Sequence, residues 1–129
     1  MKKYLLSLLV LATVAGCASP EREKQQALEL LAQKRANLLA KEVPVEFGPL
    51  SIMKARAKGS VVEIMMIDSG NGSISTKQMV ETSVKSYCTD MEVRPLLEEG
   101  LSYRIMVRNA RGQLQVDQFI TSQTCTEVL

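Results

Sequence analysis

The stretch SIMKARAKGSVVEIMMIDSG, residues 51–70, sets the fold class of this chain. Apolar and polar residues alternate from Leu50 to Ala57, and aliphatic side chains crowd the run from Val61 to Asp68. Such patterns are typical of β-strands. The two runs are joined by Lys58 and Gly59, and a glycine in so short a connection favours a tight turn. The stretch therefore predicts a β-hairpin, which the polar loop SGNGS at 69–73 follows.

A second hairpin is predicted near the C-terminus. Apolar and polar residues again alternate in SYRIMVRN at 102–109, and the turn NARG at 109–112 leads into LQVDQFI at 114–120. Between the hairpins, we expect a helix capped by Thr76 and running through Tyr87, because its apolar residues recur three or four positions apart. Pro95 then starts a short helical turn that Gly100 closes.

An amphipathic helix is predicted upstream, over about residues 21–42. Ser19 is a suitable N-cap, Pro20 suits the first helical position, and Pro44 ends the pattern. Its leucine stripe is read as core rather than as a partner site. The order of elements predicts an α+β domain over 21–129, with the N-terminal helix and further short helices on a four- to five-stranded antiparallel sheet.

Strand alternation divides the predicted sheet into two different faces. One face carries Leu50, Ile52, Val62, Ile64, Met66, Tyr103, Ile105, Val107, Leu114 and Val116. The other carries Met53, Met65, Met106 and Phe119 among the charged residues Glu63, Arg104, Arg108 and Asp117. These four apolar residues either form a loosely packed second layer or line a groove that binds a partner helix. We favour the second layer, because the N-terminal helix must bury its stripe somewhere.

The N-terminal residues have the pattern of an export signal. Lys2 and Lys3 precede the uncharged run from Tyr4 to Ala15, which has the length of a signal-peptide core rather than of a membrane span. Val14, Ala15, Gly16 and Cys17 follow the aliphatic, small, small, cysteine order of a lipobox. We therefore expect residues 1–16 to be removed and residues 17–20 to form a lipidated N-terminus with a short tether.

Cys17 is thus interpreted as the site of lipid attachment, while an ordinary signal followed by a free thiol is the alternative. Several acyl chains on one cysteine would hold a small domain at a bilayer almost permanently. Ala18 is not the aspartate that is usually tied to inner-membrane retention. The sequence therefore favours attachment to the outer membrane, facing the periplasm.

Removal of the signal changes how the charge balance and the two remaining cysteines are interpreted. Two of the sixteen Lys and Arg residues are Lys2 and Lys3, so fourteen cations remain against fourteen acidic residues. This balance gives no electrostatic case for nucleic acid, and no polybasic cluster suggests binding to anionic lipid. Export would place Cys88 and Cys125 in an oxidising compartment, where we expect them to form a disulfide.

No catalytic, cofactor or metal site is predicted. The chain contains no histidine, which excludes Ser/His/Asp and Cys/His catalysis and argues against a zinc site built on the two cysteines. Glu98 and Glu99 adjoin a helix end without a paired acid, and they are read as solvated surface. The glycines of SGNGS lack the strand and helix context of a phosphate-binding loop. We expect a protein that is not an enzyme.

The order of features resembles the α/β type of type II secretion pilotin, the AspS-like or GspS-beta family. The resemblance rests on the lipobox, on LLAQKRANLLAKEVPV, SIMKARAKGSVVEIMMIDSG, SYCTD and LLEEGLSYRIMVRNARGQ, and on a closing TC. It implies that Cys17 is the lipidated residue and that Cys88 and Cys125 form the disulfide. It also implies binding to the C-terminal segment of secretin subunits, and delivery to the outer membrane by the lipoprotein-sorting machinery.

Two other functions remain open on the sequence. A lipid-anchored inhibitor, for instance of a lysozyme, would need an exposed loop that enters an enzyme cleft, and SGNGSIS at 69–75 is the candidate. A structural envelope lipoprotein without a dedicated client is the other alternative.

Overall fold

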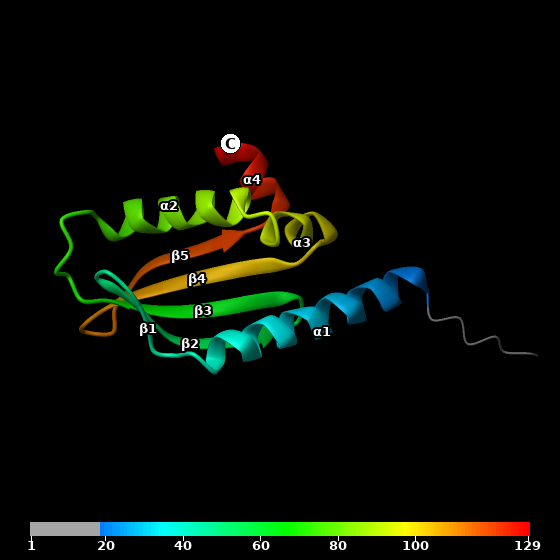
Figure 1. Ribbon diagram of the computed structural model, residues 1–129, viewed down its shortest axis with the longest axis horizontal. Helices are drawn as coiled ribbons and strands as arrows, with labels where there is room; N and C mark the ends of the chain where they lie inside the picture. The colour runs from blue at the N-terminus through cyan, green and yellow to red at the C-terminus, as the bar shows by residue number, and fades with distance from the viewer. Residues whose placement is uncertain (1–18) are drawn as a thin grey trace, which may run out of the picture.

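The computed structural model describes residues 19–129, so the predicted signal, Cys17 and Ala18 lie outside the described residues. Four helices and five strands follow one another along the chain (Figure 1). Their bounds are α1 (Pro20–Ala40), β1 (Val45–Phe47), β2 (Leu50–Lys58), β3 (Val61–Asp68), α2 (Thr76–Thr89), α3 (Val93–Glu99), β4 (Ser102–Asn109), β5 (Leu114–Ile120) and α4 (Ser122–Val128).

The five strands form one sheet in the order β1-β2-β3-β4-β5. Both predicted hairpins are present as antiparallel pairs, β2 with β3 and β4 with β5. The prediction of a wholly antiparallel sheet is wrong, because β3 and β4 pair in parallel. The chain between them forms α2 and α3, and a connection that contains helices carries the chain back to the end of the sheet where β3 began.

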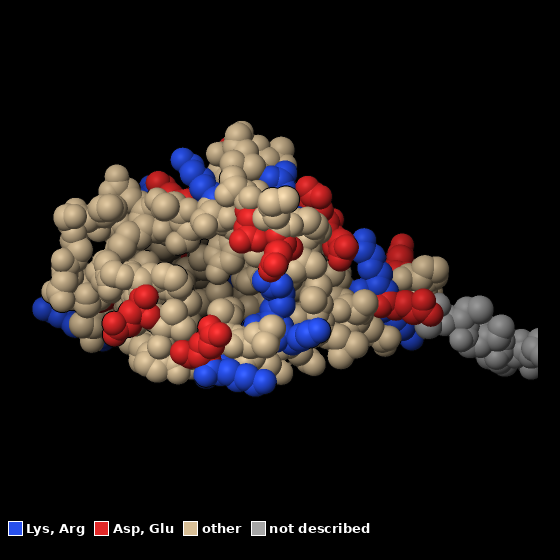
Figure 2. Space-filling view, viewed as in Figure 1, with Lys and Arg blue, Asp and Glu red and all other residues tan. Residues whose placement is uncertain are grey.

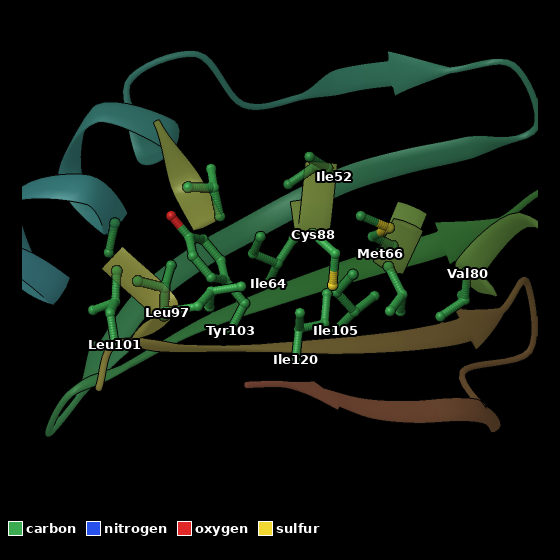
Figure 3. Close-up of a cluster of buried hydrophobic side chains, with 14 of the residues drawn as sticks. Ile52, Ile64, Met66, Val80, Cys88, Leu97, Leu101, Tyr103, Ile105 and Ile120 are labelled. Atoms are coloured by element: carbon green, nitrogen blue, oxygen red, sulfur yellow. The ribbon is translucent and has the colours of Figure 1, made fainter. Parts of the chain in front are cut away.

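All the helices pack against one face of the sheet. The core contains side chains of the sheet, such as Ile64, Ile105 and Ile120, together with Val80, Cys88 and Leu97 of α2 and α3 (Figure 3). Ala32 and Ala36 of α1 are almost fully buried, since small side chains let a helix lie close to the strands. The prediction of α+β architecture is confirmed.

The prediction that α1 forms a second layer over the Met-bearing face is wrong. The apolar stripe of α1 packs on the face that carries Ile52 and Ile64, where α2 also lies. The opposite face, with Met53, Met65, Met106 and Phe119, is left without a helix among residues 19–129. One layer of helices is sufficient to bury the leucine stripe, so the second face stays free.

Local signals place most of the helix ends. The Ser19 side chain accepts the N–H of Arg22, and Pro20 occupies the first turn of α1 as predicted. The N-cap of α2 is Ser75 and not Thr76, whose hydroxyl donates to the Asp68 carboxylate instead. The short third helix starts at Val93 rather than Pro95, because Asp90 accepts the N–H groups of its first turn.

Three features near the chain ends and edges differ from the predictions. The edge strand β1 was not predicted, and neither was α4, which begins at the capping box of Thr121 and Thr124. A register shift between Val107 and Arg108 places Leu114 opposite Arg108, so that Leu114 is exposed and not in the core. None of the helices in the described part of the chain is long and apolar enough to span a bilayer.

Candidate functional site: a groove between two helices

A groove of about 360 Å³ opens on the helical side of the molecule. It lies between the C-terminal end of α1, the edge strand β1 and the length of α2 (Figure 2). Figure 2 shows this region as a hollow that is lined by uncharged atoms, with both acidic and basic side chains on the surrounding surface. The lining residues are Leu39, Phe47, Leu50, Ile52, Met66, Thr82, Ser83, Ser86, Tyr87, Asp90 and Val93.

The floor and the walls of the groove differ in chemistry. Leu50, Ile52 and Met66 come from β2 and β3 and give the groove an apolar floor. Phe47 forms part of one wall, and more than half of its side chain is exposed. The opposite wall is the hydroxyl-bearing side of α2, with Thr82, Ser83 and Ser86. The groove therefore combines apolar surface with hydrogen-bonding groups along one edge.

Two stacked tyrosines lie at one side of the groove, which Tyr87 lines. The rings of Tyr87 and Tyr103 stack with their centroids 4.9 Å apart, and Arg35 of α1 donates a hydrogen bond to the Tyr103 hydroxyl. Burial, followed by the neighbouring Tyr103, raises the pKa of Tyr87 to about 12. This hydroxyl therefore stays protonated at neutral pH and remains available as a hydrogen-bond donor.

Asp90 supplies the only carboxylate among the lining residues. The backbone N–H groups of Val93 and Glu92 donate to it and lower its pKa, with a smaller contribution from the charge of Arg35. The groove therefore has a negative charge at one end at neutral pH. No group of three or more metal-binding side chains occurs among residues 19–129, and the groove holds no acid–base pair. Its chemistry suits the binding of an apolar segment.

The four predicted partner-binding residues lie on the open sheet face, on the opposite side from the groove. Met65 and Met106 are register neighbours on β3 and β4, and both are largely covered by surrounding side chains. Met53 lies at a bulge of β2 and is 47% exposed. Phe119 of β5 is 46% exposed, with the guanidinium of Arg104 located 5.1 Å from its ring centre. The structure thus brings together the Met pair and keeps all four residues apart from the groove.

A row of charges crosses the same open face. Glu63 is only 2% exposed and accepts hydrogen bonds from Arg56 at 2.9 Å and Arg104 at 3.0 Å. Burial by itself would raise the pKa of Glu63, but the two arginines outweigh burial and hold its pKa below the ordinary value. Arg104 also makes a two-pronged ion pair with Asp117. The charges named from the sequence therefore stabilise the sheet and form no catalytic pair.

The loop SGNGSIS at 69–75 is exposed on the surface, and the side chain of the preceding residue, Asp68, holds its start. Asp68 accepts the N–H of Gly70 at 2.8 Å and the hydroxyl of Thr76, so one carboxylate connects the two ends of the loop. Ile74 is its large exposed apolar side chain.

The predicted disulfide is present. Cys88 at the end of α2 is bonded to Cys125 of α4, and both residues are buried. This bond holds the last helix against the helix that forms one wall of the groove.

Sequence reasoning missed the groove residues. Phe47 follows Pro44 in a strand of only three residues, which is too short to show a period. The hydroxyls of α2 look like the solvated side of an amphipathic helix, and only the position of α1 turns them into a wall. The phenylalanine in VEF at 45–47, next to a proline and a glycine, was the one local signal of an exposed aromatic residue.

Comparison with known proteins identifies the family. The pilotin AspS from the type II secretion system of Vibrio cholerae is 48% identical, with a TM-score of 0.75 over 83% of this chain and 100% of that chain. The pilotin EpsS from the type 2 secretion system of Vibrio vulnificus is 44% identical, with a TM-score of 0.75 over 80% of this chain and 96% of that chain. Lipoprotein YghG of Escherichia coli K12 is 27% identical over 127 residues, which is 95% of this chain and 90% of that protein.

The family model for the type II secretion system pilotin, S protein, matches residues 24–125, a span that runs from the first turns of α1 to the disulfide cysteine of α4. The resemblance that the sequence motifs indicated is thereby confirmed. This chain belongs to the type II secretion system pilotin family.

Proposed function

We propose that this protein is an outer-membrane lipoprotein that binds the C-terminal segment of a secretin subunit in the groove between α1 and α2. The single observation that carries the proposal is a preformed apolar groove on the helical side of a chain that belongs to the pilotin family. The proposed role is that of a secretion accessory and not of an enzyme.

The groove suits a short amphipathic helix that becomes ordered on binding. Such a helix would place its apolar side chains against Leu50, Ile52 and Met66, where they displace water from an apolar floor. The hydroxyls of α2 would pair with polar groups along the edge of the helix. Asp90 favours a cationic or hydrogen-bond-donating group at its end of the groove.

The proposed lipid on Cys17 would give the complex its destination. A secretin subunit that is bound to the pilotin would travel with it on the lipoprotein-sorting machinery to the outer membrane. The relative YghG is named a lipoprotein, and the lipobox from Val14 to Cys17 supports the proposal that Cys17 of this chain carries lipid. The lipid would stay in the membrane while the domain faces the periplasm.

A binding measurement tests the groove. We expect Phe47→Asp and Ser86→Arg each to weaken binding of a peptide with the sequence of the secretin C-terminal segment by about tenfold or more, because each introduces a charge beside the apolar floor. Both positions are exposed, so the circular dichroism spectrum and the thermal unfolding curve should stay close to those of the parent. Calorimetric titration of the full mature chain gives the affinities.

Met53→Asp is the matched control on the open face, with the same kind of charge at a similarly exposed apolar residue. Full binding by this variant and loss by the groove variants support the groove. If Met53→Asp or Phe119→Asp loses binding while the groove variants keep it, the partner site is the Met-bearing face that sequence analysis had named.

The membrane that the secretin reaches is measured in cells that make both the secretin and this protein. Replacement of Cys17 by Ser should leave peptide binding intact and send the secretin to the wrong membrane, as fractionation would reveal. Strong inhibition of a lysozyme by the purified chain, without secretin binding, would instead favour the inhibitor that the loop at 69–75 suggested. A chain that neither binds secretin nor inhibits lysozyme would fit a structural envelope lipoprotein.

A further inference from the structure

The open face of the sheet is a second surface with an unusual composition. Four large apolar side chains on it are 39% to 47% exposed, namely Met53, Ile67, Leu114 and Phe119. They come from three different strands, β2, β3 and β5, and the register shift between β4 and β5 places Leu114 on this side, opposite Arg108. These exposed apolar groups are therefore distributed across the face of the sheet.

Cations surround these apolar groups. Five basic residues, Lys54, Arg56, Lys58, Arg104 and Arg108, share the face with three carboxylates, Glu46, Glu63 and Asp117, which gives a net charge of +2. Residues 19–129 contain fourteen cations and fourteen acidic residues, so the rest of this part of the chain carries −2. The open face is therefore basic relative to the rest of the described chain.

Two exposed lysines on this face lie on β2, between its bulge and the turn to β3. Lys54 and Lys58 are exposed and make no ion pair within residues 19–129, while Glu63 and Asp117 are already engaged by Arg56 and Arg104. Basic side chains beside exposed Met, Ile and Phe are the combination that binds the headgroup region of an anionic bilayer.

A short tether would hold the domain against a membrane. Cys17 precedes Ser19, the N-cap of α1, by two residues, which span at most about 7 Å. A lipid on Cys17 would therefore keep the domain in contact with the bilayer, and one of its surfaces must face the headgroups. The charge distribution favours the open sheet face, since the described residues outside that face carry a net charge of −2.

We infer that the open sheet face lies on a bilayer surface that contains anionic phospholipid, with Met53 and Phe119 reaching into the interfacial region and Lys54 and Lys58 beside lipid phosphates. This inference rests on the proposed lipid on Cys17, which supplies the proximity. In this orientation the groove points away from the membrane, where a secretin segment has access to it.

A tryptophan reporter tests the orientation, because the chain contains no tryptophan of its own. The full mature chain carrying Met53→Trp is reconstituted with vesicles of phosphatidylcholine, or of phosphatidylcholine and phosphatidylglycerol in equal amounts. We expect its fluorescence to shift to the blue with the anionic vesicles, and brominated acyl chains to quench it. Leu38→Trp on the exposed side of α1 is the matched reporter, and we expect it to remain in water.

Charge variants separate the two sides of the molecule. Lys54→Glu with Lys58→Glu should reduce the quenching of the Met53→Trp reporter by about tenfold or more, since each basic residue near an anionic surface contributes about 1 kcal/mol. Substitution of Glu for Lys34 in α1 and for Lys41 at its C-cap should leave the quenching unaltered. Quenching of the Leu38→Trp reporter instead, or no quenching of either, overturns the inference.

Two further readouts separate this inference from the proposed function. A lipid-anchored chain floats with pure phosphatidylcholine vesicles, so a chain that stays in solution lacks the lipid. In that case, direct titration with anionic vesicles decides whether the sheet face binds them. Loss of secretin-peptide binding by Lys54→Glu with Lys58→Glu, without a change in quenching, assigns the face to a protein partner and also overturns the inference.

Discussion

Glu63 is the buried charge at the centre of the ion pairs on the open sheet face. Its carboxylate is nearly inaccessible to water, and a charge in such a place is stable only when it is paired. Arg56 from β2 and Arg104 from β4 provide the pairing from the two neighbouring strands. The same three residues therefore join three strands through their side chains, in addition to the backbone hydrogen bonds.

Glu63→Gln should lower the free energy of unfolding at pH 7 by about 1–3 kcal/mol, because the hydrogen bonds of a charged group are lost in a buried place. The pKa of Glu63 is below its ordinary value of 4.5 in the folded protein, so its contribution is present above that pH and is lost as the pH falls through the lowered pKa. Urea unfolding between pH 7 and pH 3 should therefore show a flatter pH dependence in the variant.

Glu98→Gln is the matched control for this measurement. Glu98 pairs with Arg94 one helical turn away, and it is mostly exposed. Surface pairs of this kind contribute about 0–1 kcal/mol, so the control should change stability little. Equal effects of the two substitutions would show that the burial of Glu63 has no energetic weight.

Among the elements, α3 depends on a special residue at its end. Gly100 follows Glu99 with a φ of 116°, a backbone conformation that residues with a Cβ rarely adopt. The chain has to turn sharply there, because β4 starts only two residues later. A Cβ at position 100 would also lie 3.1 Å from a methyl carbon of Leu28 in α1.

Gly100→Ala should therefore cost about 1–2 kcal/mol for the backbone conformation, with an additional cost from the contact with Leu28. Gly112→Ala is the control, since Gly112 also has a positive φ but no atom within 4 Å of the added Cβ. Thermal unfolding of both variants isolates the contribution of packing. A smaller effect at Gly100 than at Gly112 would contradict the close contact between α1 and this turn.

At the scale of the whole molecule, one covalent bond connects α2 with the C-terminal helix. The disulfide between Cys88 and Cys125 joins residues 37 positions apart and encloses α3, β4 and β5 in one loop. It reduces the conformational freedom of the unfolded chain, and it holds the last strand against fraying. The wall of the groove that α2 forms is thereby fixed to the rest of the domain.

The double substitution of Cys88 and Cys125 by Ala should lower the free energy of unfolding by roughly 4 kcal/mol for a loop of this length. Urea unfolding of the parent, with and without a reductant, gives the comparison. Reductant should have no effect on the variant, which serves as its own control. Unchanged stability of the parent on reduction would show that the packing of α4 is sufficient without the bond.

The two sides of the molecule differ in a way that fits two simultaneous contacts. The helical side has an apolar groove, and the open sheet face carries more basic than acidic side chains. Since these surfaces lie on opposite sides of one sheet, occupation of one leaves the other accessible.

Local patterns in the sequence predicted the elements well. Both hairpins, α1 and the helix from Thr76 follow from apolar periodicity, from Ser19 and Pro20 at a helix start, and from the glycines at turns. Each of these signals acts over a few residues, so a linear sequence contains it in full. The partner of Cys88 also followed, because only two cysteines remain after Cys17.

Tertiary structure decided the features that depend on distant segments. The parallel pairing of β3 with β4 arises from the path of α2 and α3 across one face, and that path is set by packing rather than by any local residue pattern. The groove exists because α1 and α2 lie on the same face without closing the gap beside Phe47. The sequence alone therefore determined the elements and the residue types on each strand face. The side of the sheet on which the helices pack was decided only in the folded chain, because burial of their apolar stripes depends on contacts between distant segments.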